Sequence, residues 1–136
     1  MRACLLWISL WAALWHTQAA AQSLLPNEEG ERVVLSARVE MPRARLSGLC
    51  VVVCQEGKLR AGLVNEFGFT ALAFRYDPAT GKVKLTETAA LLDKWYIRRT
   101  LRRDLRAVMQ GLAAGQTEYR NPKRGITYQF TPTPCN

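Results

Sequence analysis

The sequence predicts an α+β domain in which a curved, mainly antiparallel sheet of five to six strands carries one amphipathic helix packed across it. Segments typical of half-buried strands follow one another from position 32 to position 87, with connections of hairpin length. One longer segment, starting near Asp93, instead repeats its apolar residues every three or four positions, as an amphipathic helix does. Strands joined mainly by short turns, with a helix placed after them, indicate an α+β fold.

The first 21 residues are expected to be an export signal and not part of this domain. Arg2 is followed by an apolar run from Ala3 to Trp15 and by the small residues Ala19-Ala20-Ala21, which suit signal peptidase. The alternative is an uncleaved anchor or a buried first helix. Cleavage would leave 136 − 21 = 115 residues, enough for one domain. We therefore expect a periplasmic or otherwise extracytoplasmic protein with no transmembrane segment after cleavage.

A short lead-in precedes the first strand. Residues 22–31 contain proline, glycine and acidic residues without an alternating pattern, so we expect a flexible lead-in there and a single α+β domain over 32–136. Every second position of Arg32–Glu40 is apolar, which predicts a half-buried strand. Pro42 ends this pattern because it has no N–H for a central strand ladder.

The second strand is predicted to be central and covered on both faces, because Leu46–Gln55 is largely apolar without alternation. Turn-forming residues at Asn65–Gly68 and Asp77–Lys82 separate the later strands, and 119–125 is expected to be a basic loop. The expected strands are 32–40, 46–55, 59–63, 69–76, 83–87 and 126–130.

The helix is expected to begin with Asp93 as its N-cap and to end at Gly111 or Gly115. Its apolar residues fall on one stripe of about a third of the helix circumference. They are Ile97, Leu101, Leu105, Val108, Met109 and Leu112. This stripe is predicted to pack against the sheet.

Five arginines gather on the helix, opposite most of the apolar stripe, and are the candidate partner- or anion-binding residues. They are Arg98, Arg99, Arg102, Arg103 and Arg106. Guanidinium groups bind phosphate and carboxylate through paired hydrogen bonds, so this face suits a phosphorylated glycolipid or an acidic partner. The alternative is a solvated helix back that keeps the domain soluble. Asp104, near the edge of the stripe, is expected to be an intramolecular ion-pair partner.

The cysteines are expected to be structural. Cys50 and Cys54 lie on one strand about 13 Å apart, too far for a disulfide between them. Both are predicted to be small buried residues, and the pairing of either one with Cys135 is left open. Three cysteines at this spacing do not suit a metal site, so no metal is expected.

Aromatic residues surround the predicted sheet and helix, and they support either of two interpretations. They are Phe67, Phe69, Phe74, Tyr76, Trp95, Tyr96, Tyr128 and Phe130. A concave sheet lined with such residues can have a solid core, or it can hold an acyl chain or another apolar ligand. The sequence does not locate such a pocket.

Several short motifs carry a family resemblance. Leu46-Ser47-Gly48-Leu49, Leu63-Val64-Asn65-Glu66-Phe67-Gly68, Phe74 and Leu101-Arg102-Arg103-Asp104-Leu105-Arg106 follow one another in this order. In these motifs the chain resembles small, uncharacterised envelope proteins of Bacteroidota. It is more distantly similar to the half-barrel proteins that carry and receive lipoproteins. The resemblance implies a half-barrel, an extracytoplasmic location and a role in binding or envelope assembly.

Composition narrows the function classes. The only histidine, His16, lies in the expected signal, so the secreted form would lack a Ser-His or Cys-His relay and the commonest transition-metal ligand. Without Arg2 the charge is 18 − 11 = +7, which favours anionic partners. We expect a non-enzymatic protein without a cofactor that binds a lipid, an anionic envelope surface or an envelope protein, and no nucleic acid. The alternative is a structural or interaction module with a solid core.

Overall fold

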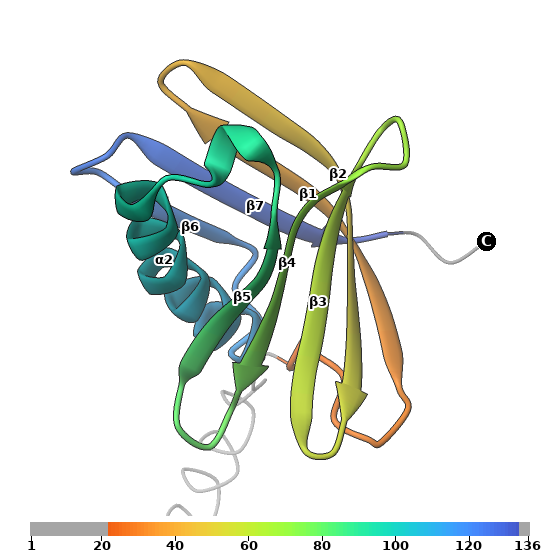
Figure 1. Cartoon of the computed structure of the whole chain (residues 1–136). Coiled ribbons are helices and arrows are strands. Elements are labelled where there is room, and N and C mark those ends of the chain that lie inside the picture. Colours follow the sequence, from red (N-terminus) through yellow and green to blue (C-terminus); the bar gives the residue numbers. More distant parts are fainter. Residues whose placement is uncertain (1–21, 134–136) are drawn as a thin grey trace, which may run out of the picture.

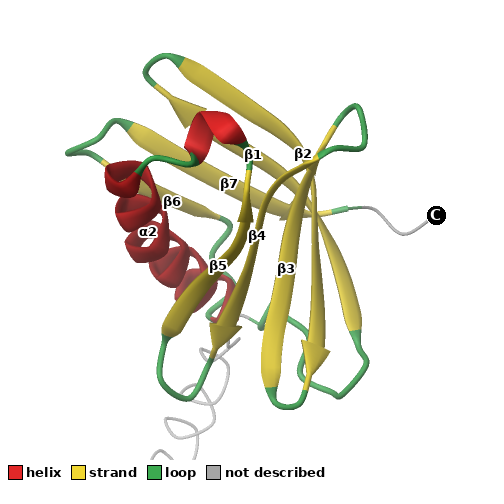
Figure 2. Cartoon of the chain, in the orientation of Figure 1, coloured by secondary structure: helices red, strands yellow, loops and turns green. Residues whose placement is uncertain are grey.

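The computed structural model describes residues 22–133, and it has the α+β class that the sequence predicts. A curled antiparallel sheet forms a half-barrel, and one long helix lies across its concave side (Figures 1 and 2). The strands are β1 (Arg32–Met41), β2 (Ala44–Gln55), β3 (Lys58–Asn65), β4 (Thr70–Asp77), β5 (Lys82–Thr88), β6 (Glu118–Asn121) and β7 (Ile126–Pro132). A short 3-10 turn, η2 (Ala90–Leu92), and the helix α2 (Trp95–Ala113) connect β5 to β6.

The sheet has seven strands in the order β5-β4-β3-β2-β1-β7-β6, not the five to six that were predicted. The missed strand is β6, which lies partly within the expected basic loop. It pairs with β7, with Tyr119 opposite Tyr128. Its sequence, Glu-Tyr-Arg-Asn, offers one apolar residue in four positions, and this is too few for an alternating pattern to be visible.

The core lies between the concave face of the sheet and the helix. Alternate residues of each strand point inward, and α2 buries the predicted stripe, including Leu101 and Leu105. The space left beneath the helix is only about 10 Å³, so side chains fill the interior of the half-barrel. The aromatic residues Phe74, Tyr128 and Phe130 belong to this solid core.

The prediction that β2 is covered on both faces is wrong. Only its inward side chains are buried, and Leu49 on the outer face is 46% exposed. The reason is that α2 packs on one side of the sheet, and no described element covers the other side (Figure 2). Cys50 and Cys54 point inward and are buried free thiols, whereas Cys135 lies outside the described residues.

Gly48 allows β2 and β3 to approach each other closely where the sheet curls. A Cβ atom built at Gly48 would lie 1.9 Å from the carbonyl oxygen of Val64 on β3. The pairing of β3 with β4 shifts register between Leu63 and Val64, beside this point. Bulges and glycines are the usual means by which a sheet bends, so we infer that these positions shape the half-barrel.

The start of the helix differs from the prediction, whereas its end agrees with the prediction. Lys94, not Asp93, occupies the N-cap position, and no side chain caps the helix there. The Asp93 carboxylate instead accepts hydrogen bonds from Arg98 and Thr88. At the other end Gly115 adopts φ +84°, and the amides of Gly115 and Gln116 bond back to the last turn, as in a Schellman motif.

The lead-in joins the fold earlier than expected. Leu25 is 6% exposed and belongs to the core, and the Leu24 amide donates to the carbonyl of Leu112 at the end of α2. The Glu29 carboxylate accepts the amide of Glu56 in the β2–β3 turn. Residues 22–31 contain too few apolar residues for a periodic pattern, yet they are bonded to the end of α2 and to the β2–β3 turn. Residues 22–31 are therefore part of the folded domain. The expected signal, residues 1–21, lies outside the described residues.

Because the sheet is antiparallel, its connections divide between two ends of the half-barrel. One end holds the β1–β2, β3–β4 and β6–β7 turns and the start of α2 (Figure 1). We call this end the rim, and it comprises residues 42–43, 66–69, 89–96 and 122–125. The opposite end holds the β2–β3 and β4–β5 turns, the end of α2 and residues 22–31.

Candidate functional site

A two-part cleft opens at the rim, between the first turns of α2 and the turns that join β1 to β2 and β6 to β7. Its polar compartment has a volume of about 630 Å³, and its apolar compartment has a volume of about 510 Å³. Tyr96, Thr100 and Arg124 line both compartments, so the two adjoin. The cleft brings together three segments that are far apart in the sequence.

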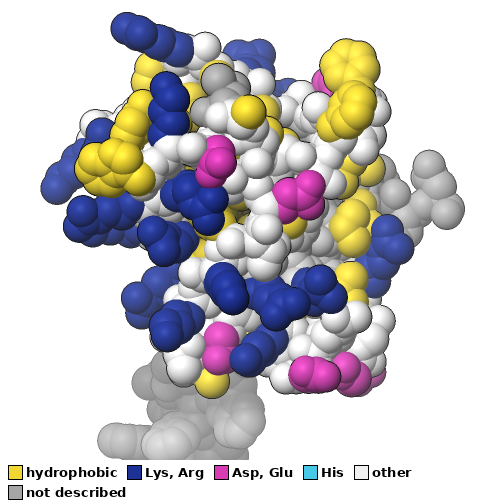
Figure 3. Space-filling model, viewed as in Figure 1, with side chains coloured by type: hydrophobic (Ala, Val, Ile, Leu, Met, Phe, Trp, Pro, Cys, Tyr) yellow, Lys and Arg dark blue, Asp and Glu magenta, His cyan; other side chains and the backbone are white. Residues whose placement is uncertain are grey.

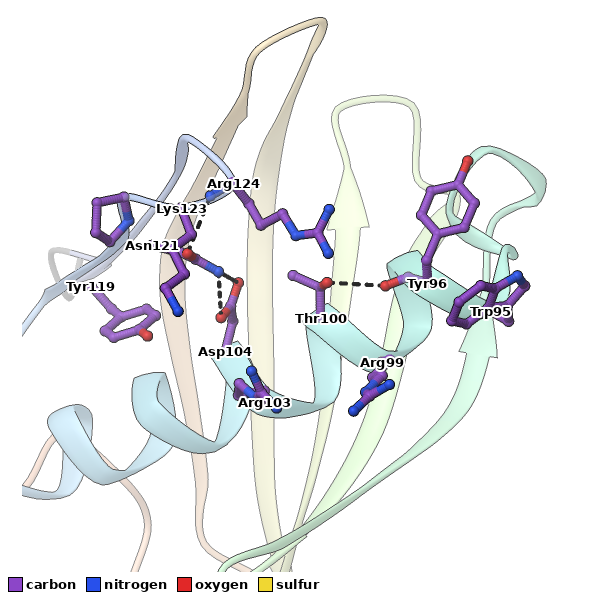
Figure 4. A pocket seen from close by; sticks show the side chains of 11 residues that line it. Trp95, Tyr96, Arg99, Thr100, Arg103, Asp104, Tyr119, Asn121, Lys123 and Arg124 are labelled. Carbon is purple, nitrogen blue, oxygen red and sulfur yellow. Dashed lines mark hydrogen bonds between the residues drawn. The ribbon is translucent and has the colours of Figure 1, made fainter.

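The polar compartment is cationic. Arg99 and Arg103 come from α2, and Lys123 and Arg124 come from the β6–β7 turn. Figure 4 shows Arg124 extending from this turn toward Thr100 on the helix. All four cations are exposed, and none of them is in an ion pair within the described part of the chain. Such a compartment attracts a phosphate or a carboxylate.

Asp104 is buried at the base of this compartment and fixes its geometry. Its carboxylate accepts the Asn121 amide at 3.0 and 3.1 Å (Figure 4). It also accepts the Tyr128 hydroxyl at 2.8 Å. Asn121 in turn accepts the backbone N–H of Arg124, 3.3 Å away. The network therefore ties the cationic turn to the helix. Burial, together with the nearby Asp104 charge, raises the pKa of Tyr128 well above its usual range, so its hydroxyl stays a donor.

The expectation that Asp104 forms an ion pair is wrong. Its side chain has no exposed surface, and its partners within residues 22–133 are a neutral amide and a phenol. Asp104 falls three residues after Leu101 and four before Val108, which places it on the buried stripe itself. This spacing is the feature of the sequence from which the burial of Asp104 could have been predicted. The partners could not be recognised because they come from β6 and β7.

The apolar compartment lies on the other side of Tyr96 and Thr100. Its walls come from the β1–β2 connection, the start of α2 and the first residue of β7. They include Met41, Pro42, Leu92, Ile97, Leu101 and Ile126. Arg43 and Arg124 stand at its edge. An apolar group placed here would lie within reach of the cations, because the two compartments share one wall.

The five predicted arginines do not form one face around one site. Arg99 and Arg103 line the polar compartment. Arg98 pairs with the Asp93 carboxylate at 2.8 Å, and this contact holds the pKa of Asp93 below its usual value. Arg106 lies over the β4–β5 turn, where its guanidinium is near Gly81. Arg102 is exposed and lines neither compartment.

Known proteins, metal-ligand groups and membrane-spanning helices give no further indication of what this site does. No protein-family profile, curated protein or solved structure matches the chain. Within residues 22–133, no group of three potential metal ligands comes together. No helix in the same range is long and apolar enough to cross a membrane. The chemistry of the cleft is therefore the basis for assigning a function.

Proposed function

We propose that this chain is a non-enzymatic, extracytoplasmic protein that binds an anionic amphipathic component of the cell envelope, such as a lipid with a phosphate or carboxylate head group. The observation that carries this proposal is the contact between a cationic compartment and an apolar compartment along one wall. An anionic head and a hydrocarbon tail on one molecule would satisfy both compartments together.

The charges support an anion in the polar compartment. Four cations line it, and the single carboxylate there, Asp104, is already used by Asn121 and Tyr128. Arginine offers a planar pair of N–H donors that matches phosphate and carboxylate oxygens. The buried Asp104 network gives the polar compartment a rigid base. This supports anion binding, because preorganised donors lose less conformational entropy when a ligand binds.

The filled interior favours a second candidate function, a structural or interaction module without a small ligand. A lipid cannot enter a space of about 10 Å³ beneath the helix without moving the helix. In our proposal the ligand therefore occupies the cleft at the rim and leaves the core unchanged. Both candidates agree with the fold, and a binding experiment distinguishes them.

Three probes test the proposal on the form that starts at Gln22. These are dodecyl phosphate, dodecyl maltoside and inorganic phosphate, each titrated calorimetrically below any critical micelle concentration. We expect dodecyl phosphate to bind more tightly than either of the others, because it alone offers both chemistries. Arg103→Ala with Arg124→Ala should weaken that binding by at least about tenfold, since each removes a charge-assisted hydrogen bond.

The matched control is Arg102→Ala, which removes the same charge from the same helix outside the cleft. It should leave dodecyl phosphate binding unchanged. Equal binding of dodecyl phosphate and dodecyl maltoside would contradict the assignment of the cations. No binding of any probe would favour the solid-core interaction module.

A further inference from the structure

The rim exposes an unusual set of large hydrophobic side chains. Among the side chains that the structure describes, five large hydrophobic ones are exposed, and four of them lie at the rim: Phe67, Phe69, Trp95 and Tyr96. Phe67 is 83% exposed, and Trp95 is 75% exposed. Figure 3 shows hydrophobic groups standing out over the β3–β4 turn and, among Lys and Arg side chains, at the start of α2. Exposed aromatic residues gathered at one end of a domain indicate an interaction surface.

The β3–β4 turn is built to hold its two phenylalanines outside the sheet. The Asn65 side-chain oxygen accepts the amides of Phe67 and Phe69, each at 3.0 Å. Gly68 adopts φ +84° and donates its amide to the carbonyl of Asn65. The Glu66 carboxylate accepts the Ser47 hydroxyl on β2. The turn is thus a fixed structure, and the exposure of its aromatic rings is a property of that structure.

Charge is distributed unequally between the two ends of the half-barrel. The rim carries the exposed cations Arg43, Lys94, Lys123 and Arg124, and its two carboxylates, Glu66 and Asp93, already accept hydrogen bonds. At the opposite end, residues 22–31 and the β2–β3 turn carry four carboxylates and no Lys or Arg, namely Glu28, Glu29, Glu31 and Glu56, although Arg32, Lys58 and Lys82 begin the strands beside them. An anionic surface would therefore attract the rim more strongly than it attracts the connections at the other end.

We propose that the rim docks end-on onto an anionic phospholipid bilayer, with Phe67, Phe69 and Trp95 entering the head-group region. Aromatic rings favour the membrane interface, and neighbouring cations add attraction to anionic lipids. The cleft opens at the same rim, so docking would place its mouth against the lipid surface. This proposal does not require that a ligand binds in the cleft.

Vesicle flotation tests the proposal on the form that starts at Gln22. Phosphatidylcholine vesicles are compared with vesicles that also contain phosphatidylglycerol. We expect binding to the second kind alone, weakening as salt rises. Phe67→Ala with Phe69→Ala should lower the bound fraction by about tenfold at low vesicle concentration, because both rings would no longer enter the interface. Fluorescence of Trp95, the single tryptophan of this form, should shift to the blue on binding.

Two controls separate docking from folding and from ligand binding. Leu49→Ala removes an exposed hydrophobic residue from the outer face of the sheet and should not change flotation. The double phenylalanine variant should melt in urea like the wild type and bind dodecyl phosphate normally, since neither residue lines the cleft. Flotation of this variant equal to that of the wild type overturns the proposal. So does a wild type that binds neither vesicle, an outcome that would assign the rim to a protein partner.

Discussion

Removal of the Asp104 carboxylate should destabilise the fold strongly, although no ion pair is lost. Asp104→Ala leaves the buried Tyr128 hydroxyl without its acceptor and deprives the half-buried Asn121 amide of its partner. Each buried group left without a partner costs about 1–3 kcal/mol, and water replaces part of the Asn121 bond. We therefore expect the free energy of unfolding to fall by about 2–4 kcal/mol.

Urea denaturation of a double-mutant cycle measures this effect. Tyr128→Phe alone should cost about 1–2 kcal/mol, because Asp104 keeps its bonds from Asn121. The double variant should cost at least about 1 kcal/mol less than the sum of the two single variants, since the hydroxyl without an acceptor is then absent. Arg102→Ala, on the exposed side of the same helix, is the control and should stay within about 0.5 kcal/mol of the wild type. Additive single effects, or an Asp104→Ala variant as stable as the wild type, would refute the network.

Gly48 and Cys50 give two further testable predictions. Gly48→Ala should destabilise the fold by about 3 kcal/mol or more in urea melts, because the new Cβ would meet the Val64 carbonyl. Gly62→Ala on the neighbouring strand, where a Cβ meets nothing within 4 Å, should be neutral or slightly stabilising, and equal effects would contradict the close approach at Gly48. Burial raises the pKa of Cys50 to about 12, so its thiol should not react with a thiol reagent at about pH 8 until the chain unfolds. Labelling a variant that carries both Cys54→Ser and Cys135→Ser, in the form that starts at Gln22, with and without urea measures this, and rapid reaction of the folded protein would show that the Cys50 thiol is accessible.

The strands from β1 to β5 could be predicted because their signals are local. Their inward residues alternate along each strand, and residues such as Asn65, Pro78 and Gly81 mark the turns between them. The buried stripe of α2 and its end at Gly115 follow from the same kind of short-range pattern. The sequence does not show whether the sheet encloses a cavity, because the volume of a core depends on how all side chains pack together.

The cleft could not be predicted because its parts meet only in the folded chain. Arg99 and Arg103 were among the five candidate arginines, whereas Lys123 and Arg124 were assigned to a loop. The position of Lys123 and Arg124 over the helix depends on strand β6. This strand has a single half-buried aromatic residue, Tyr119, so its sequence shows no alternating pattern. The burial of Asp104 likewise depends on partners from two other strands.

The pairing of β7 with β1 has a consequence for the order in which this chain folds. The strands from β5 to β1 lie in sheet order and form by successive hairpins, which close short loops. The bond from Thr133 to the carbonyl of Val34 instead joins residues 99 positions apart. Loop-closure entropy delays such contacts, so β7 should add late to a preformed meander. Until then the edge of β1 opposite β2 lacks its final neighbour, and the folding chain would present an open strand edge to chaperones and to other copies of itself.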